Sequence, residues 1–202
     1  MSPPPVIFYF DFSSPYGYLA AQRIDALAAE HGAAVTWRPH LLGAAFKLTG
    51  QSPLLDQPLK GDYARRDLAR SARRLGVPFA LPDPFPFSGV ALSRAFYWLE
   101  DARGPDAARA FARRAYHAVF GEARDLSKPP TVVDLLVADG IDRAAAEAAL
   151  ADPAVKERLR AEVDAALARG IFGSPYILVG DEPFWGYDRL PDIAACLREG
   201  GW

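Results

Sequence analysis

The fold is decided by one stretch near the start of the chain, Val6-Ile7-Phe8-Tyr9-Phe10-Asp11-Phe12-Ser13-Ser14-Pro15-Tyr16-Gly17. Its first five residues form an unbroken run of β-branched and aromatic side chains, which is typical of a strand buried on both faces. Pro15 suits the first turn of a helix, and Ser13 or Ser14 could cap that helix. Apolar residues continue at helical spacing until Gly32, so the stretch predicts a buried strand followed by one helix.

The neighbouring segments extend this unit to β-α-β. Residues 34–38 alternate apolar and polar side chains and end at Pro39, which indicates a second strand. The length of the helix between the two strands suits a parallel crossover. A long connection rich in glycine and proline follows over residues 41–60, and such connections inside compact domains are often functional.

The rest of the chain is predicted to be helical until a sheet returns near its end. Helical patterns cover residues 62–74, 90–100, 105–120, 132–139, 143–150 and 153–169. Residues 176–179 and 184–186 then read as two strands of a hairpin, and a last helix runs from about Tyr187 to Arg198. This order predicts an α/β protein, a thioredoxin-like fold with an inserted all-helical domain. We expect residues 1–40 and 170–202, with the helix at about 153–169, to form the thioredoxin-like domain, and residues 41–152 to form the insertion.

Composition narrows the function classes. The 202 residues are 50% hydrophobic and carry a formal net charge of −2, which disfavours disorder and nucleic-acid binding. Cys196 is the only cysteine, so an internal disulfide and a Cys-x-x-Cys pair are excluded, and with three histidines no metal site is expected. Neither a signal peptide nor a membrane-spanning segment is recognisable, and we expect a cytoplasmic protein that binds no membrane.

Two short motifs are candidates for chemistry. Ser14 to Gly17 occupies the strand-to-helix corner that holds the redox Cys-x-x-Cys in thioredoxins. The free N–H groups and the dipole of a helix start favour an anion or a thiolate there, although a plain helix cap is the simpler explanation of Ser14 taken alone. In a thioredoxin-like fold, the peptide bond between Ser174 and Pro175 is expected to be cis, which leaves the backbone before it able to pair with an extended peptide.

Three longer motifs carry a family resemblance. They are Phe8-Tyr9-Phe10-Asp11-Phe12-x-Ser14-Pro15-Tyr16-x-Tyr18-Leu19-Ala20, Gly170-Ile171-Phe172-Gly173-x-Pro175 and Phe184-Trp185-Gly186-x-Asp188-Arg189-Leu190. With them the sequence resembles the 2-hydroxychromene-2-carboxylate isomerases, which belong with the kappa-class glutathione transferases in the DsbA-like thioredoxin group. The resemblance spans nearly the whole chain.

The resemblance implies where glutathione and substrate bind. It implies that Ser14 contacts the glutathione sulfur, and that Ser174 beside Pro175 pairs its main chain with the cysteinyl part of glutathione. The γ-glutamyl end would be lined by Trp185, Gly186, Tyr187 and Asp188. The substrate side would include Lys47, Gln51 and Phe85.

Several alternatives stay open at these positions. Asp188 could cap the last helix instead of holding the α-ammonium group, and Lys47 could be a solvated lysine. Ser13 precedes Ser14, so either hydroxyl could face the thiol. Ser174 stands where a branched apolar residue is common in relatives.

The implied activity is a glutathione-dependent cis–trans isomerisation of 2-hydroxychromene-2-carboxylate or a similar unsaturated aromatic oxo acid. The thiolate would add reversibly to the conjugated double bond, which could then rotate. The alternatives are a kappa-like transferase that leaves glutathione on an electrophile, and a non-catalytic thiol-binding protein. The resemblance also implies a homodimer.

Overall fold

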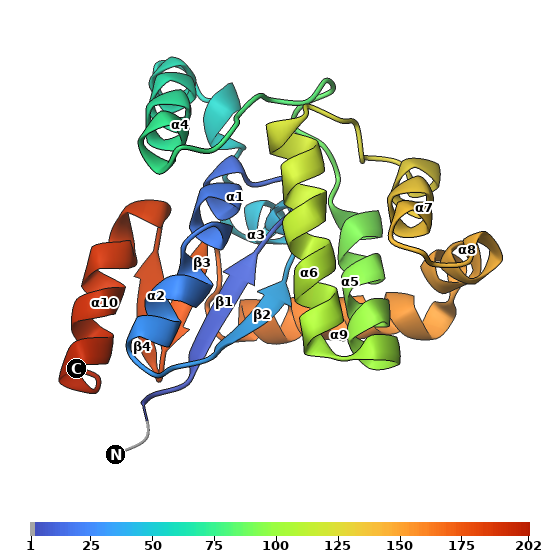
Figure 1. Ribbon diagram of the computed structural model, residues 1–202. Helices are drawn as coiled ribbons and strands as arrows, with labels where there is room; N and C mark the ends of the chain where they lie inside the picture. Colours follow the sequence, from blue (N-terminus) through green and yellow to red (C-terminus); the bar gives the residue numbers. More distant parts are fainter. Residues whose placement is uncertain (1–2) are drawn as a thin grey trace.

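A four-stranded mixed sheet lies at the centre of the molecule in the computed structural model, which describes residues 3–202 (Figure 1). Its strands are β1 (Val6–Phe10), β2 (Val35–Pro39), β3 (Tyr176–Val179) and β4 (Glu182–Trp185), in the order β2-β1-β3-β4. β1 runs parallel to β2 and antiparallel to β3, and β3 pairs antiparallel with β4. The predicted β-α-β unit and the final hairpin are therefore confirmed, and all four strands lie within two residues of their predicted positions.

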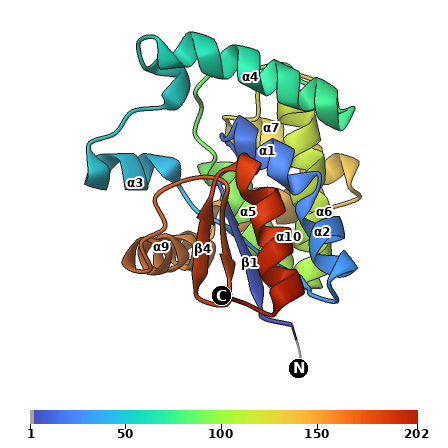
Figure 2. The same ribbon diagram turned by 90° about the vertical axis from the view of Figure 1, so that its left-hand side faces the viewer.

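Helices make up most of the remaining chain. They are α1 (Pro15–Ala21), α2 (Ile24–Glu30), α3 (Leu42–Thr49), α4 (Lys60–Leu75), α5 (Val90–Arg103), α6 (Pro105–Tyr116), α7 (Pro129–Ala138), α8 (Arg143–Ala151), α9 (Pro153–Ala168) and α10 (Leu190–Glu199). Short helical turns lie at η1 (Leu54–Asp56), η2 (His117–Gly121) and η3 (Tyr187–Arg189). In Figure 2, α9 covers one face of the sheet and α2 and α10 lie on the other. The predicted thioredoxin-like fold with its helical insertion is the fold observed.

Two local predictions were wrong. The first helix is not continuous, because the chain bends at Gln22 and Arg23 between α1 and α2. The N–H groups of these two residues donate to carbonyls only three residues back, Leu19 and Ala20, which tightens the backbone and redirects the helix. The connection over residues 41–60 is not irregular throughout, because it contains α3 and η1.

The two faces of the sheet bury different side chains because successive residues in a strand point to opposite sides. On β1, Val6, Phe8 and Phe10 join the main core with α1, α2, α5 and α6. Ile7 and Tyr9 point the other way and pack with Ala166 of α9 in a smaller cluster. This double-sided burial explains why β1 reads as an unbroken apolar run.

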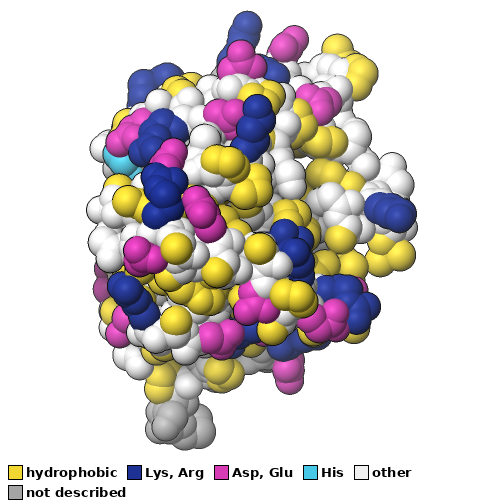
Figure 3. Space-filling model, turned by 90° about the vertical axis from the view of Figure 1, so that its right-hand side faces the viewer, with side chains coloured by type: hydrophobic (Ala, Val, Ile, Leu, Met, Phe, Trp, Pro, Cys, Tyr) yellow, Lys and Arg dark blue, Asp and Glu magenta, His cyan; other side chains and the backbone are white. Residues whose placement is uncertain are grey.

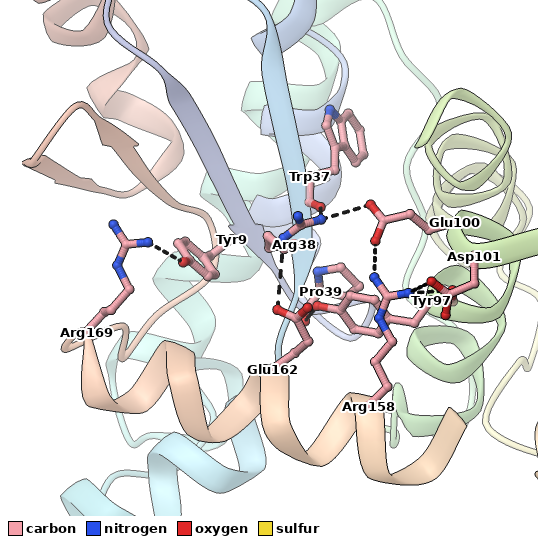
Figure 4. A network of polar contacts seen from close by, with 10 residues as sticks. All are labelled: Tyr9, Trp37, Arg38, Pro39, Tyr97, Glu100, Asp101, Arg158, Glu162 and Arg169. Carbon is pink, nitrogen blue, oxygen red and sulfur yellow. Dashed lines mark hydrogen bonds and ion pairs between the residues drawn. The ribbon is translucent and has the colours of Figure 1, made fainter. Parts of the chain in front are cut away.

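The helical block shares the main core with the sheet. Buried side chains of α5 to α8 belong to the same cluster as those of β1 and α1. An ion-pair network also joins β2, α5 and α9 (Figure 4). In it, Glu100 accepts hydrogen bonds from Arg38 at 2.8 Å and from Arg158, which also pairs with Asp101. The assignment of residues 41–152 to a separate domain stays a prediction.

The molecular surface mixes charges of both signs. On the face shown in Figure 3, acidic and basic side chains are interspersed with apolar ones. Within residues 3–202, no helix combines the length and the apolar character that a membrane crossing requires.

Candidate functional site

A cleft lies at the junction between the end of β1 and the start of α1. It has a volume of about 1820 Å³, and α4 passes over α1 beside it (Figures 1 and 2). Its lining comes from α1, α2, α3, α4, the segment around η1, the loop before α5, the loop before β3, the end of β4 with η3, and the start of α10. Of the predicted site residues, Ser14, Gln51, Phe85, Ser174, Pro175 and residues 185–188 all line it.

Ser14 lies at the start of α1 and is 4% exposed. Its Oγ accepts a hydrogen bond from the Gly17 N–H at 3.0 Å and donates one to the Ser174 carbonyl at 2.8 Å. The hydroxyl therefore caps α1 and also faces the loop before β3. A helix start with a capping hydroxyl is suited to stabilising an anion placed against it.

The Ser174–Pro175 peptide bond is cis, as expected from the sequence. Its surroundings differ from the expectation in one respect, because the Ser174 carbonyl is already engaged by Ser14 Oγ. The Ser174 Oγ accepts from the Asp11 N–H at 2.9 Å. A peptide pairing with the Ser174 carbonyl would thus compete with the Ser14 hydroxyl and release its proton for another acceptor.

Ser13 has a different environment from Ser14. Its hydroxyl donates to Asp11 Oδ1 at 2.8 Å, and its N–H donates to the same oxygen at 2.8 Å. The other carboxylate oxygen of Asp11 accepts from the Leu42 N–H at 2.7 Å. Asp11 is 3% exposed, and these bonds compensate the burial of its charge. Ser13 is thereby directed towards the carboxylate, and Ser14 towards Gly17 and Ser174.

Another part of the cleft lining is formed by residues Trp185 to Asp188. Trp185 is 58% exposed and stacks edge-on against Phe172, with ring centroids 4.9 Å apart. A Cβ on Gly173 would overlap the Trp185 indole, so this close approach requires glycine. Asp188 does not cap α10, whose N-cap is Arg189 without a side-chain bond. The capping interpretation of Asp188 is therefore wrong. The Asp188 carboxylate instead accepts from Arg189 at 2.8 Å and is largely exposed.

The predicted substrate side is only partly assembled. Gln51 and Phe85 line the cleft, and the Phe85 ring packs against Phe120 at 6.3 Å between centroids. Lys47 lies on α3 with an exposed side chain and is not part of the lining. Lys60, at the start of α4, lines the cleft instead. The sequence could not show which of the two lysines lies at the cleft, because the path of the long connection between them was not predictable.

Two titratable side chains at the site have shifted pKa values. Tyr16 lines the cleft and donates to Asp67 of α4 at 2.8 Å; burial, reinforced by this carboxylate, raises the pKa of Tyr16. His40 is 1% exposed and contacts the Gly173 carbonyl through Nε2 at 2.8 Å. Burial lowers the pKa of His40, although nearby Asp11 acts in the opposite direction. At neutral pH the tyrosine is therefore a hydrogen-bond donor and the histidine is uncharged.

The roles of some residues at this site could not be predicted from local sequence. Asp11, His40 and Tyr116 come together only because the end of β1, the end of β2 and the end of α6 meet behind Ser14. Their hydrogen bonds span up to 163 residues of sequence, and no local spacing reveals such a contact.

The comparisons with known proteins agree with the geometry. The family model for the DSBA-like thioredoxin domain matches residues 5–198. The 2-hydroxychromene-2-carboxylate isomerase of Pseudomonas putida is 35% identical over 190 residues, covering 92% of this chain and 90% of the relative. The isomerase of the same name from Sphingobium xenophagum is 32% identical, covering 95% and 97%.

The chain belongs to the 2-hydroxychromene-2-carboxylate isomerase family, within the DsbA-like thioredoxin proteins.

One solved structure and a more distant relative agree with this assignment. A solved 2-hydroxychromene-2-carboxylate isomerase superposes with a TM-score of 0.82 at 32% identity, over 96% of this chain and 94% of the other. A kappa 2 glutathione transferase of Caenorhabditis elegans is 26% identical over 96% of this chain and 92% of the relative. The names of the family members support an isomerase, with glutathione transferases as more distant relatives.

Proposed function

We propose that the protein is a glutathione-dependent cis–trans isomerase of 2-hydroxychromene-2-carboxylate or a closely similar unsaturated aromatic oxo acid. The observation that carries the proposal is the Ser14 hydroxyl at the start of α1, in a cleft to which the chain brings no thiol of its own. Cys196 is buried in α10. A reactive sulfur at this corner must therefore arrive with a ligand.

Glutathione would lie in the cleft as an extended peptide beside Pro175. Its cysteinyl backbone would pair with Ser174, and its γ-glutamyl end would reach Trp185, Gly186, Tyr187 and Asp188, with the exposed Asp188 carboxylate facing the α-ammonium group. A thiol has a reference pKa near 8.5, and each unit of lowering corresponds to about 1.4 kcal/mol. The Ser14 hydroxyl and the α1 dipole supply stabilisation of that order.

The proposed reaction balances without any other reactant. The cyclic hemiketal first opens, with its hydroxyl proton passing to the ring oxygen, and gives a phenol and a conjugated keto acid. The thiolate adds to the double bond of this keto acid, and the electron pair moves onto the ketone oxygen as an enolate. The former double bond is now single and can rotate. Collapse of the enolate expels the thiolate and restores the double bond in the other geometry, so glutathione is recovered.

The enolate needs a cation or a hydrogen-bond donor nearby. Lys47 is the sequence prediction for this role, and it stays untested. Lys60 is the candidate that the cleft favours, because it is part of the lining and Lys47 is not. The Tyr16 hydroxyl also lines the cleft, but its one proton is donated to Asp67, so it reaches an enolate only by giving up that bond. Gln51 and Phe85 would contact the aromatic acid.

A kappa-like transferase is the second candidate, favoured by the identity to the kappa-class relatives. The assay that separates the two follows the spectrum of 2-hydroxychromene-2-carboxylate with the protein and glutathione, together with a titration of free thiol. Isomerisation with all thiol recovered supports the isomerase. Loss of thiol in proportion to product supports the transferase. The absence of glutathione binding overturns both enzyme proposals. Binding without either change leaves a non-catalytic thiol-binding protein. The homodimer and the cytoplasmic location stay predictions.

A further inference from the structure

A buried hydrogen-bonded cluster lies directly behind Ser14. Its centre is the Asp11 backbone carbonyl, which accepts from the Ser14 N–H at 2.8 Å and from the Tyr116 hydroxyl at 2.8 Å. The Asp11 N–H donates to Ser174 Oγ at 2.9 Å. Both backbone groups of the residue that begins the turn into α1 are thus held by side chains from distant parts of the chain.

Tyr116 reaches this position from the end of α6. The next turn, His117–Gly121, is a π-helix, a local widening that often occurs at functional sites. The Tyr116 side chain is fully buried, and its ring packs on Phe10, Phe12 and Phe120. Because a buried hydroxyl without a partner is costly, the bond to Asp11 fixes the orientation of Tyr116 as well as that of Asp11.

Tyr116 stays a neutral donor at physiological pH. Burial raises its pKa well above the ordinary value, and the Asp11 charge adds to this, while the Ser174 hydroxyl acts in the opposite direction. The hydroxyl can therefore donate to the Asp11 carbonyl throughout the range in which an isomerase would work.

The same cluster determines which residue can stand at position 17. A Cβ on Gly17 would lie 2.5 Å from the Tyr116 hydroxyl oxygen and 2.9 Å from Ser174 Oγ. Only glycine lets α1 approach these two hydroxyls, and its N–H then reaches Ser14 Oγ. Gly17 stands where a thioredoxin has its second redox cysteine, and here Tyr116 and Ser174 leave no space for a side chain at that position.

We propose that Tyr116 and the Ser174 side chain are positioning residues for Ser14, which hold the Asp11 backbone so that the Ser14 hydroxyl is directed at the sulfur of a bound glutathione. The inference rests on the proposed function and adds two residues to it. Neither hydroxyl needs to touch glutathione, since each acts through Asp11.

The test is the pKa of the thiol of bound glutathione, read from thiolate ultraviolet absorbance in wild type and in Tyr116→Phe. This substitution removes one oxygen and keeps the ring. We expect the bound-thiol pKa to rise by about half to one unit, the equivalent of one net hydrogen bond. Activity lost at neutral pH should then return at higher pH, whereas mere destabilisation would lower activity at every pH.

The matched control is Tyr97→Phe. The Tyr97 hydroxyl is also buried and donates to a backbone carbonyl, that of Pro39, at 2.8 Å. The Tyr97→Phe substitution should destabilise the fold to a similar degree and leave the pKa of the bound thiol unchanged. Should Tyr116→Phe fail to fold, Ser174→Ala is measured in its place, with Ser174→Thr expected to restore the wild-type pKa because it keeps a hydroxyl.

The outcomes separate this inference from the proposed function. If the pKa of the bound thiol is lowered in wild type and keeps the same value in both Tyr116→Phe and Ser174→Ala, the inference is overturned and the proposed function stands. An equal shift in Tyr97→Phe also overturns it. A wild-type protein that binds no glutathione thiolate overturns the proposed function and the inference together.

Discussion

At the scale of single residues, the candidate site depends on hydroxyl groups at a helix start. Ser14 uses its N–H, its Oγ and its carbonyl, the last accepting from the Tyr18 N–H at 3.0 Å. These bonds join the residue to Asp11 after β1, to the first turns of α1 and to the loop before β3. The position of the Ser14 side chain is therefore fixed before any ligand binds. Its proton, which is donated to the Ser174 carbonyl, becomes available to a thiolate once a ligand peptide pairs with that carbonyl.

Gly17 gives the first prediction at this scale. Gly17→Ala places a methyl group 2.5 Å from the Tyr116 hydroxyl oxygen, and overpacking of this kind costs about 1–3 kcal/mol. Gly43→Ala is the control, because Gly43 lies in α3 and a Cβ there meets nothing within 4 Å. That variant should be neutral or stabilised by up to about 1 kcal/mol. Urea denaturation measures the free energy of unfolding of both variants. Equal values would contradict the claim that Tyr116 and Ser174 leave no space for a side chain at position 17.

His40 predicts a pH dependence of stability. Burial lowers its pKa in the folded state below the ordinary value of 6.5, so the unfolded chain binds more protons just below pH 6.5. The contribution of neutral His40 is complete above pH 6.5 and is lost as the pH falls towards the folded-state pKa. Denaturation between pH 7.5 and 5 should show a smaller loss of unfolding free energy in His40→Gln than in wild type. Parallel curves for the two proteins would refute this.

Two lysines of the long connection give a paired prediction. Lys60 lines the cleft, whereas Lys47 is exposed on α3. If a lysine stabilises the enolate or the substrate carboxylate, Lys60→Met should lower kcat/KM by about 10- to 100-fold, as expected for one charged hydrogen bond. Lys47→Met should stay within about twofold. A larger loss in Lys47→Met would return the role to Lys47.

At the scale of elements, one ion-pair network fastens the sheet to the helices around it. Glu100 of α5 is 14% exposed and lies between Arg38 of β2 and Arg158 of α9 (Figure 4). Arg158 also lies over the Tyr97 ring at 4.9 Å. Removing the central carboxylate leaves two arginines close together without their shared partner, which costs more than the loss of an exposed pair.

Glu100→Gln should therefore lower the free energy of unfolding by about 1–3 kcal/mol. The control is Asp134→Asn, which removes the exposed partner of Arg143 at 2.7 Å and should cost less than about 1 kcal/mol. Thermal unfolding of the two variants measures the difference. If Glu100→Gln is as stable as Asp134→Asn, the network does not join the elements in the way described.

At the scale of the whole molecule, the sequence predicts the architecture better than the site. The strands were predictable because β1 and β3 are buried on both faces and therefore carry continuous apolar runs. The break between α1 and α2 was not, since neither glycine nor proline marks it. Ser14 and Ser174 were found through motifs, but the roles of Asp11 and Tyr116 depend on contacts between residues 105 positions apart.

The central claim is that the Ser14 corner stabilises the thiolate of a bound glutathione. The most direct measurement is the pKa of that bound thiol in wild type and in Ser14→Ala, from thiolate absorbance against pH. The account predicts a wild-type pKa about one to two units below the reference value of 8.5, and a rise of about one unit in Ser14→Ala. A bound thiol with its ordinary pKa in wild type, or an unchanged pKa in Ser14→Ala, would contradict the claim.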